Sequence, residues 1–396
     1  MPRLLPSTIS AKPLAVGAAT RLALECKESP LFAGSTLKTP GTPAFFYNIR
    51  QNMDLHGGVG PLIPINAPII TPAVQSRLPK WITEIAYSPQ GPQILAQRWE
   101  NIELVEKQRM EQIVMGKGMQ GRFSISAAME RGDKNRYPNI WPFEWNRIKI
   151  PQTTPNENYF NGSLIWNGQS IARRYIATQA PVPGTFEDFW KVVWGEGVQV
   201  IVCLTAAEEG GQVRFLDVDG TDEIKCHPYW TANTAGEMHI MPVHETIVSL
   251  GAGQSAILRT LMLQNRAEPF ATLREIIHLH YEGWPDFGIP AEAATILSLV
   301  RLLNEVVARR VKAANAPVVV HCSAGCGRTG TFCTVDNVIK AIGNGDGNMD
   351  EDLIYQTVLG IREQRMSLVQ TLRQYVLCYE CVLQHLLGKI TDRGNR

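Results

Sequence analysis

Residues 316–333 read APVVVHCSAGCGRTGTFC and carry the clearest structural signal in the chain. The apolar run at the start predicts a short buried strand, and the sequence from residue 328 to 342 predicts a helix. A loop with several glycines lies between them. This order of strand, loop and helix places Cys322 at the start of the loop and Arg328 near the N-terminus of the helix.

The loop has the composition of an anion-binding site. A helix N-terminus leaves backbone N–H groups unpaired and carries partial positive charge. Glycines allow successive N–H groups to turn toward a tetrahedral anion. Arg328 adds a planar fork of donors that matches two phosphate oxygens. We therefore expect a phosphate to be held by the backbone of five residues, Ser323, Ala324, Gly325, Cys326 and Gly327.

The same loop favours a reactive Cys322. A thiol at a helix N-terminus beside an arginine is expected to be a thiolate at neutral pH, and a thiolate below a phosphoryl group is a nucleophile aimed at phosphorus. A Walker A loop does not explain the stretch, because its lysine is absent. The alternative is an ordinary buried cysteine. The anion loop, Arg328 and the hydroxyl of Thr329 together favour the nucleophile.

The segment HCSAGCGRTG resembles the signature of the cysteine-dependent protein tyrosine phosphatases, in their tyrosine-specific branch. Four further segments resemble other motifs of that family, in the family's order: KNRYPNI (134–140), ATQAP (177–181), WPDFGIP (284–290) and QRMSLVQTLRQY (364–375). The resemblance covers roughly residues 93–390. It implies a highly twisted mixed β-sheet flanked by helices, in an α/β chain with a single catalytic domain of the non-receptor type.

The resemblance also implies roles for particular residues. Asp286 corresponds to a general acid on a loop that closes over substrate, and Tyr137 to an aromatic wall that stacks on the phosphotyrosine ring. Gln370 and Gln374 correspond to the pair that positions the hydrolytic water. Thr329 is expected to donate a hydrogen bond toward the sulfur, although a helix N-cap role is equally available to it.

Three positions depart from the family pattern or leave a choice open. Asn139 stands where the family usually has an aspartate that holds the substrate backbone, so the affinity for peptides is in question. Glu208 or Glu209 is expected to orient the loop arginine, and the sequence does not choose between them. Cys326 stands where relatives often carry an aliphatic residue. It either fills space or protects the nucleophile by forming a disulfide during oxidation.

The family resemblance implies a protein tyrosine phosphatase that works through a phosphocysteine intermediate, without metal or other cofactor, in signal transduction. The alternative is a catalytically inactive module that binds phosphotyrosine proteins. Inactive relatives usually lose the nucleophile, the arginine or the lid acid, whereas this chain has Cys322, Arg328 and Asp286.

Composition limits the kinds of partner and the cellular location that we expect. The chain has 396 residues, 44% of them hydrophobic and 19% charged, with a net charge of +1, which gives no reason to expect nucleic acid as a partner. Its apolar stretches are too short to span a membrane. A catalytic thiol needs a reducing compartment, so we expect the cytoplasm, with the nucleus as a second location. The first residues overlap in composition with a mitochondrial presequence, but Pro6 and Pro13 would interrupt its helix.

Prolines divide the chain, since 13 of the 25 fall in residues 1–92. That segment is expected to be a mostly unstructured or loosely docked extension, and residues 93–390 the catalytic domain. Five Ser/Thr-Pro dipeptides in the extension suggest proline-directed phosphorylation, with a mitogen-activated protein kinase as candidate partner and substrate. Chance in a proline-rich segment is the competing explanation. The dipeptides begin at Ser29, Thr39, Thr42, Thr71 and Ser88.

The rest of the chain alternates between short β-type runs and helical segments, which indicates an α/β layer structure with a partly parallel sheet. An apolar stripe that begins at Leu95 and Trp99 predicts a helix packed on the catalytic domain, with a partner-binding helix as the alternative. We expect strands at 147–150, 175–179, 198–204, 276–281 and 316–322, and helices at 185–194, 291–311, 328–342 and, as a pair, over 350–388.

Overall fold

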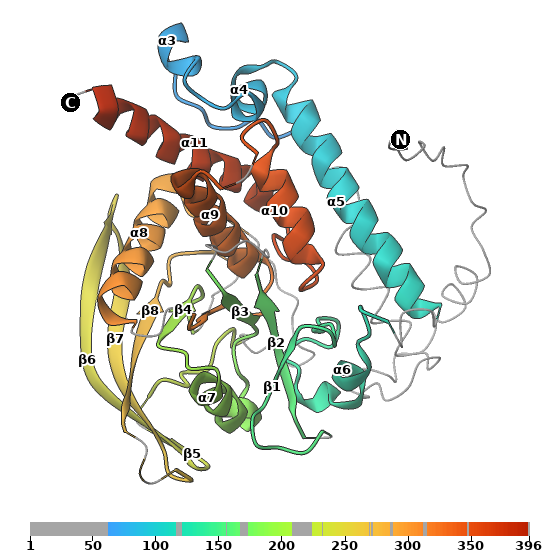
Figure 1. The fold of residues 1–396 in the computed structure, drawn as a ribbon, viewed down its shortest axis with the longest axis vertical. Helices are drawn as coiled ribbons and strands as arrows, with labels where there is room; N and C mark the ends of the chain where they lie inside the picture. Colours follow the sequence, from blue (N-terminus) through green and yellow to red (C-terminus); the bar gives the residue numbers. More distant parts are fainter. Residues whose placement is uncertain are drawn as a thin grey trace, which may run out of the picture.

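A nine-stranded twisted sheet runs through the centre of the protein (Figure 1). The computed structural model describes residues 62–115, 121–155, 157–166, 173–207, 224–231, 233–268, 270, 272–285, 288–311, 315–346 and 348–394. Within these ranges the strand order is β1-β2-β3-β9-β4-β8-β7-β6-β5. The four middle strands β3, β9, β4 and β8 are parallel, and the strands on either side of them pair antiparallel. The expected mixed sheet is confirmed.

The strands differ greatly in length, because the central ones are short and one flanking hairpin is long. Their bounds are β1 Arg147–Lys149, β2 Tyr159–Ile165, β3 Tyr175–Thr178, β4 Val200–Cys203, β5 Asn233–Ala235, β6 Met238–Gly251, β7 Gln254–Asn265, β8 Arg274–His280 and β9 Val318–His321.

Helices cover both faces of the sheet. Four of them lie on one face, α8 (Ala293–Arg310), α9 (Gly327–Asn344), α10 (Leu353–Arg362) and α11 (Leu372–Gly394), while α7 (Phe186–Gly195) lies on the other. The remaining helices are α3 (Pro72–Gln75), α4 (Lys80–Tyr87), α5 (Gly91–Val114) and α6 (Ser126–Glu130), with short 3-10 turns η2 (Gly132–Lys134) and η3 (Pro183–Thr185).

Strand β9 illustrates why the centre of the sheet is apolar on both sides. Val318 and Val320 point into the core beneath α8 to α11, whereas Val319 points into the core beneath α7. Parallel strands covered on both faces read as continuous apolar runs, and β-branched valines suit the pleated surface. The carboxyl end of such a central parallel strand is the usual position of a ligand site, and Cys322 follows β9 directly.

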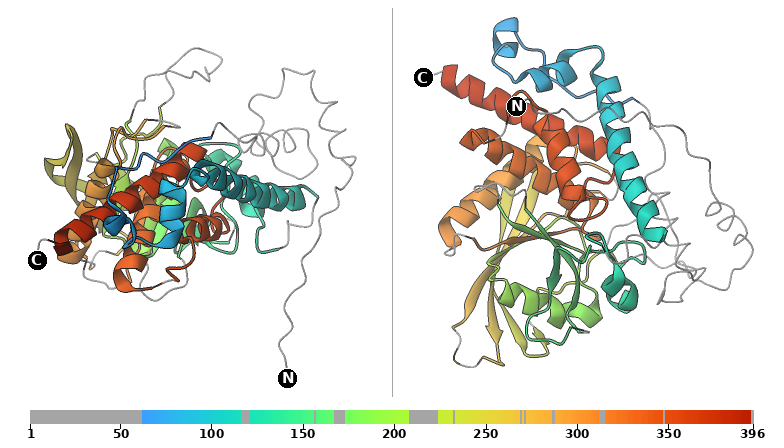
Figure 2. Two further views of the ribbon diagram at one scale, coloured as in Figure 1. Left: turned by 90° about the horizontal axis from the view of Figure 1, so that it is seen from above. Right: turned by 45° about the vertical axis from the view of Figure 1, so that its right-hand side comes forward.

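Residues 62–92 differ from the loosely docked extension that the sequence suggested. Helix α4 buries Trp81, Ile82 and Ile85 in the main core, and the Trp81 ring meets Tyr379 of α11 edge-on at 6.3 Å. The backbone N–H of Asn66 donates to Glu380 on the same helix at 3.0 Å. Packed structure therefore begins well before residue 93. Figure 2 shows α3 and α4 beside the end of α11.

The helix expected from the apolar stripe that begins at Leu95 and Trp99 is confirmed as α5. Its apolar stripe is buried against the rest of the fold, including Leu95, Trp99 and Ile102. Further along, Met110 and Ile113 join a third cluster, which also contains Cys326 of the loop after β9. The stripe is therefore an internal packing surface.

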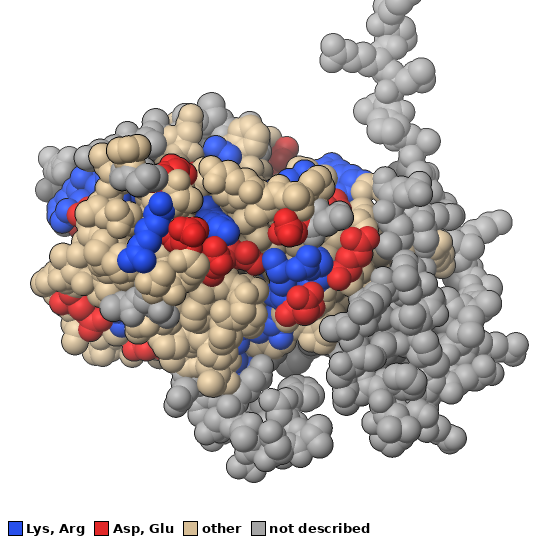
Figure 3. All heavy atoms as spheres, turned by 90° about the horizontal axis from the view of Figure 1, so that it is seen from below, with Lys and Arg blue, Asp and Glu red and all other residues tan. Residues whose placement is uncertain are grey.

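Among the described residues, none of the helices is both long and apolar enough to cross a membrane. On the face in Figure 3, acidic and basic side chains lie interspersed among uncharged ones.

Candidate active site

The loop after β9 turns sharply enough to require glycine. Gly325 has φ +70°, and a Cβ added there would lie 2.1 Å from the carbonyl oxygen of Thr178 on β3. Both the left-handed conformation and this close approach exclude side chains. Gly330 is needed for a different reason, because an added Cβ would lie 2.3 Å from the backbone nitrogen of Val369. The glycines thus let the loop pack tightly between two neighbouring segments.

Arg365 holds the outer side of the loop. Its Nε donates to the carbonyl of Gly325 at 2.9 Å, and its Nη2 donates to the carbonyl of Ala324 at 3.0 Å. In a planar trans peptide the carbonyl and the next N–H point in opposite directions. The N–H groups of Gly325 and Cys326 therefore face away from Arg365, toward the inside of the loop. The fully buried guanidinium fixes the orientation that an anion cradle needs.

Three functional side chains lie at the start of helix α9. Cys322 is only 3% exposed, and the hydroxyl of Thr329 donates to its Sγ at 3.3 Å. Arg328 is also 3% exposed, and its Nη1 donates to the carbonyl of Trp284 at 2.9 Å. The structure thus brings the expected nucleophile, the hydroxyl and the arginine to one helix N-terminus, where the helix dipole favours negative charge.

Tyr137 reaches the loop through Ser323. The two hydroxyl oxygens are 2.8 Å apart, and Ser323 donates its proton to the carbonyl of Lys225 at 3.0 Å. Since a hydroxyl has one proton, Tyr137 must donate to Ser323. The half-buried Tyr137 ring is thereby fixed at the edge of the loop, and half-buried Asn139 follows it on the same segment.

The two expected glutamines lie against the loop. The backbone N–H of Gln370 donates to Oε1 of Gln374 at 3.0 Å, and a Cβ on Gly327 would meet that oxygen at 2.7 Å and the Gln370 Cβ at 3.1 Å. Gln374 also donates to the carbonyl of Gly288 at 3.5 Å. The pair therefore sits between the anion loop and the segment that carries the expected lid.

The backbone before Gln370 is strained, and hydrogen bonds from other segments hold it in this conformation. Ser367 and Val369 have φ of 57° and 61°, a region that costs a non-glycine residue about 1 kcal/mol or more. Arg362 donates to the carbonyls of Leu368 and Val369 at 2.9 and 2.5 Å. Glu106 of α5 accepts from the N–H of Ser367 at 2.7 Å and from Arg362 at 2.7 Å. Buried charged groups thus hold this turn in place.

The segment that carries the expected lid is described only in part. Trp284 is fully buried, and its Nε1 donates to the carbonyl of Gly288 at 3.1 Å, a bond that links the described residues on either side of positions 286 and 287. Asp286, the expected general acid, lies outside the described residues. Glu208 and Glu209, the two candidates for orienting Arg328, also lie outside them.

Cys326 points into the core below the loop. It is fully buried in the cluster that contains Trp141 and Met366, and burial raises the pKa of its thiol to about 12. Its Sγ lies 3.7 Å from the carbonyl of Ala324. Among the described residues all seven cysteines are free thiols.

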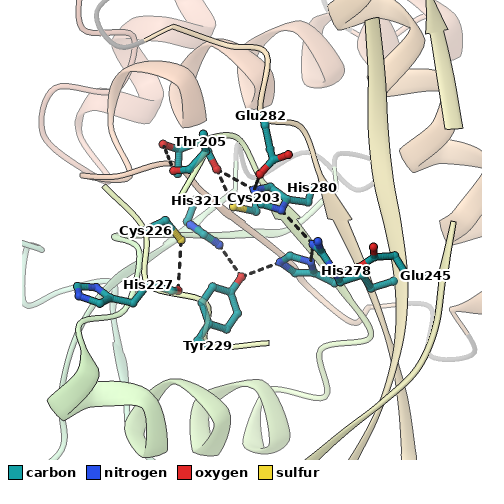
Figure 4. A network of polar contacts seen from close by, with 12 residues as sticks. Cys203, Thr205, Cys226, His227, Tyr229, Glu245, His278, His280, Glu282 and His321 are labelled. Atoms are coloured by element: carbon teal, nitrogen blue, oxygen red, sulfur yellow. Dashed lines mark hydrogen bonds and ion pairs between the residues drawn. The ribbon is translucent and has the colours of Figure 1, made fainter. Parts of the chain in front are cut away.

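A group of histidines lies behind the loop (Figure 4). Cys203, His278 and His321 have ligand-capable atoms within 4.8 Å of one another. Both nitrogens of His278 and of His321 already take part in hydrogen bonds, and Arg259 places a guanidinium against His278. A cation would have to displace these bonds beside an existing positive charge. The arrangement fits a hydrogen-bond network better than a metal centre.

Sequence reasoning missed several residues that support the site. Arg365 lies inside the motif at 364–375, but only the fold shows that it holds the loop carbonyls. Glu106 acts from a helix far away in sequence, which no local pattern indicates. Tyr229 and His278 approach His321 only in the folded chain, where β8 and β9 pair with opposite edges of β4 and the segment after residue 223 brings the Tyr229 hydroxyl between the two histidines.

A twisted mixed sheet with a cysteine–arginine anion loop at the carboxyl end of its central strand is the architecture of the cysteine-dependent phosphatase class. The family model for protein-tyrosine phosphatase matches residues 131–384, and the chain belongs to that family. The resemblance noted in the sequence is thereby confirmed.

The curated relatives of this chain include receptor-type tyrosine-protein phosphatases. Human receptor-type tyrosine-protein phosphatase alpha is 35% identical over 264 residues, covering 66% of this chain and 30% of the relative. Tyrosine-protein phosphatase 3 of Dictyostelium discoideum is 37% identical over 270 residues, covering 66% of this chain and 25% of the relative. The chain spans less than a third of the length of these two curated relatives.

Solved structures agree with this assignment. The catalytic domain of human protein tyrosine phosphatase non-receptor type 18 matches with a TM-score of 0.61 at 30% identity, over 74% of this chain and 96% of that one. A complex of that phosphatase with HER2 phosphopeptides matches with a TM-score of 0.60 at 29% identity, over 74% of this chain and 93% of that one.

Proposed function

We propose that this protein hydrolyses phosphotyrosine in proteins by two displacements at phosphorus, without metal. The observation that carries the proposal is the geometry around Cys322. Its sulfur lies 3.3 Å from the Thr329 hydroxyl, at the N-terminus of a long helix, beside buried Arg328. Backbone N–H groups of the loop and the arginine fork together suit a phosphoryl group that develops charge on its equatorial oxygens.

In the first step the Cys322 thiolate attacks phosphorus. The bond from phosphorus to the tyrosine oxygen breaks, and that oxygen takes a proton from Asp286 as it leaves. The product is dephosphorylated tyrosine and a phosphocysteine. Arg328 contributes a bidentate contact that a lysine cannot reproduce.

In the second step water attacks the phosphocysteine. Gln370 and Gln374 position the water, Asp286 accepts its proton, and the sulfur leaves as a thiolate. Thr329 stabilises the departing thiolate because its hydroxyl already donates toward the sulfur. Inorganic phosphate is released and Cys322 is regenerated.

The aromatic wall expected from the family resemblance would select the substrate class. Tyr137 stands at the edge of the loop as a wall for the phosphotyrosine ring, so phosphoserine and phosphothreonine would not reach Cys322. The related phosphatase with bound HER2 phosphopeptides supports a phosphotyrosine protein as substrate. Asn139 supplies no charge to the substrate backbone, and we therefore expect modest affinity for peptides.

We further propose that residues 93–390 carry the catalytic domain and that it works in the cytoplasm, where the thiol stays reduced. A nuclear pool and a mitogen-activated protein kinase substrate are parts of the same proposal. The nuclear pool rests on the same need for a reducing compartment, and the kinase link rests on the Ser/Thr-Pro dipeptides. Of these, Ser29, Thr39 and Thr42 lie outside the described residues, and Thr71 is exposed at the N-cap of α3.

The test is turnover of a generic aryl phosphate in the presence of a metal chelator. We expect wild-type activity to persist, Cys322→Ser to fall below about one percent of it while still binding phosphopeptide, and Arg328→Lys to be nearly inactive. Residual turnover well above that level in Cys322→Ser would remove the nucleophile assignment. Binding without any turnover in the wild type would instead favour the inactive binding module.

The physiological substrate is best sought by trapping. Asp286→Ala retains the nucleophile and the cradle but lacks the proton donor, so it should hold phosphotyrosine proteins from a lysate and release them slowly. Vanadate, which competes for the cradle, should release the trapped proteins. Phosphate mapping of the five dipeptides in protein from its native cells tests the kinase link, which zero occupancy at all five would refute.

A further inference from the structure

A polar network behind the loop runs through His278 and Tyr229 to His321 (Figure 4), and His321 contacts the backbone of Cys322. Arg259 on β7 places Nη1 3.4 Å from Nδ1 of His278 on β8. The other nitrogen of His278, Nε2, lies 3.0 Å from the Tyr229 hydroxyl. That hydroxyl lies 2.6 Å from Nε2 of His321, whose Nδ1 is 3.0 Å from the carbonyl oxygen of Cys322.

The two ends of this network fix the direction of every bond in it. A guanidinium only donates, so Nδ1 of His278 accepts and its Nε2 carries the proton. A carbonyl only accepts, so Nδ1 of His321 carries the proton and its Nε2 accepts. The Tyr229 hydroxyl must then accept from His278 and donate to His321. All four hydrogen bonds point toward Cys322.

Burial keeps the imidazoles in the neutral form that this arrangement needs. Tyr229, His278 and His321 are almost fully buried. Burial lowers the pKa of His321 to about 3 and lowers the pKa of His278 well below its ordinary value. In a poorly solvated site, hydrogen bonds that point the same way polarise one another.

We propose that His278 is a positioning residue for catalysis, which acts through Tyr229 and His321 to set the orientation of the Cys322 peptide and the polarity around it. The donor of His278 fixes the Tyr229 hydroxyl with its proton toward His321. His321 in turn holds the carbonyl of Cys322, at the point where β9 ends and the loop begins. The inference rests on the proposed function, because it concerns the same nucleophile.

His280 provides an internal comparison on the same strand. Its Nδ1 accepts from the same Arg259 nitrogen at 3.0 Å, but its Nε2 donates to the carbonyl of Thr205 at 2.8 Å and does not approach Tyr229. Both histidines are buried and share one donor, yet only His278 is connected to His321.

The experiment compares substitutions that break or preserve the network. His278→Leu removes both bonds. His278→Gln can preserve them, because its amide oxygen can accept from Arg259 and its NH₂ can donate to Tyr229. We expect kcat on an aryl phosphate to fall about three- to tenfold in His278→Leu, the effect of one modest hydrogen bond. KM should stay within about twofold, and His278→Gln should retain wild-type kcat.

A double-mutant cycle with Tyr229→Phe separates transmission through the tyrosine from a general loss of packing. If His278 acts through Tyr229, the double variant Tyr229→Phe/His278→Leu should lose no more than Tyr229→Phe alone. Losses that multiply independently would overturn the proposal. Equal kcat in His278→Leu and His278→Gln would also overturn it.

Two further measurements test the hydrogen-bond network without an activity assay. NMR of imidazole-labelled wild-type protein should find the Nε2–H tautomer for His278 and His280 and the Nδ1–H tautomer for His321. A Nε2–H tautomer at His321 would refute the network, even if His278→Leu fails to fold. Alkylation of Cys322 by iodoacetamide at fixed pH should slow in His278→Leu and not in His278→Gln. If the wild type turns over no aryl phosphate, the proposed function fails while these two readouts still test the network.

Discussion

Lowering the pH from 7 to 5 should destabilise the protein through its buried histidines. Burial lowers the pKa of His321 to about 3, against about 6.5 in an unfolded chain. Below pH 6.5 the unfolded state therefore binds a proton that the native state refuses. Stability is fully present above this pH and is lost as the pH falls from about 6.5 toward 3.

The magnitude follows from the width of that window. A pH of 5 lies about 1.5 units below the ordinary pKa of His321 in the unfolded chain. Each unit corresponds to about 1.4 kcal/mol, so the free energy of unfolding falls by about 2 kcal/mol. Burial lowers the pKa of His278 and of His280 as well, so both add to the loss in the same direction.

The assay is urea unfolding at pH 7, 6 and 5 under reducing conditions, followed by the fluorescence of the nine tryptophans. His278→Gln is the matched variant, because it keeps the hydrogen bonds and lacks one titrating ring. It should lose less stability than the wild type over the same range. An equal free energy of unfolding at pH 7 and pH 5 would refute the reasoning, since it would mean that His321 accepts a proton in the folded protein.

Three further outcomes follow from the packing of the loop. Gly325→Ala should lower the free energy of unfolding, measured by thermal unfolding, by about 2 kcal/mol or more and should abolish turnover. The control is Gly184→Ala, where an added Cβ meets no atom within 4 Å, and it should leave turnover unchanged. Equal effects of the two substitutions would show that Gly325 is not required by the loop. Glu106→Gln should lower the free energy of unfolding by about 2 kcal/mol and slow hydrolysis of the phosphocysteine in single-turnover kinetics. A wild-type rate of hydrolysis would show that Glu106 does not position the turn before Gln370. Cys326→Val should recover from mild peroxide with thiol reductant as fully as the wild type, because Cys326 points into the core; poorer recovery would assign it a protective role.

Local patterns were sufficient for the centre of the fold. The expected strands around 175–179, 198–204, 276–281 and 316–322 correspond to β3, β4, β8 and β9, because buried parallel strands are continuous apolar runs. The expected helices also correspond to α7 to α11 within a few residues.

The periphery was harder to predict. The long hairpin of β6 and β7 was not expected, although its turn contains Gly251 and Gly253 with positive φ. Its outer strand is largely exposed, so it lacks the apolar run that marked the central strands. Helix α4 was missed because it lies in a proline-rich segment, where composition suggested a loose tail. Its place in the core depends on partners far along the chain, such as Tyr379 of α11, which meets Trp81.

The site divides in the same way. Cys322, Arg328 and Thr329 are close in sequence, so their convergence at one helix N-terminus was predictable. Arg365 and Glu106 are different, because their roles depend on carbonyls and N–H groups whose positions arise only from the tertiary fold. A motif can indicate the chemistry of a loop, but not which distant charge keeps the backbone in a strained conformation.

The contact between Glu106 and Ser367 also constrains the order in which the chain folds. These residues are 261 positions apart, so helix α5 leaves the ribosome long before the turn that it must hold has been synthesised. Closing a loop of that size is entropically costly, and contacts of such long range slow folding. The apolar stripe of α5 therefore cannot be buried until α10 and α11 have been synthesised. Until then it is exposed to chaperones and to other chains. The turn that precedes Gln370 is thus completed late in folding, only when α5 has packed against it.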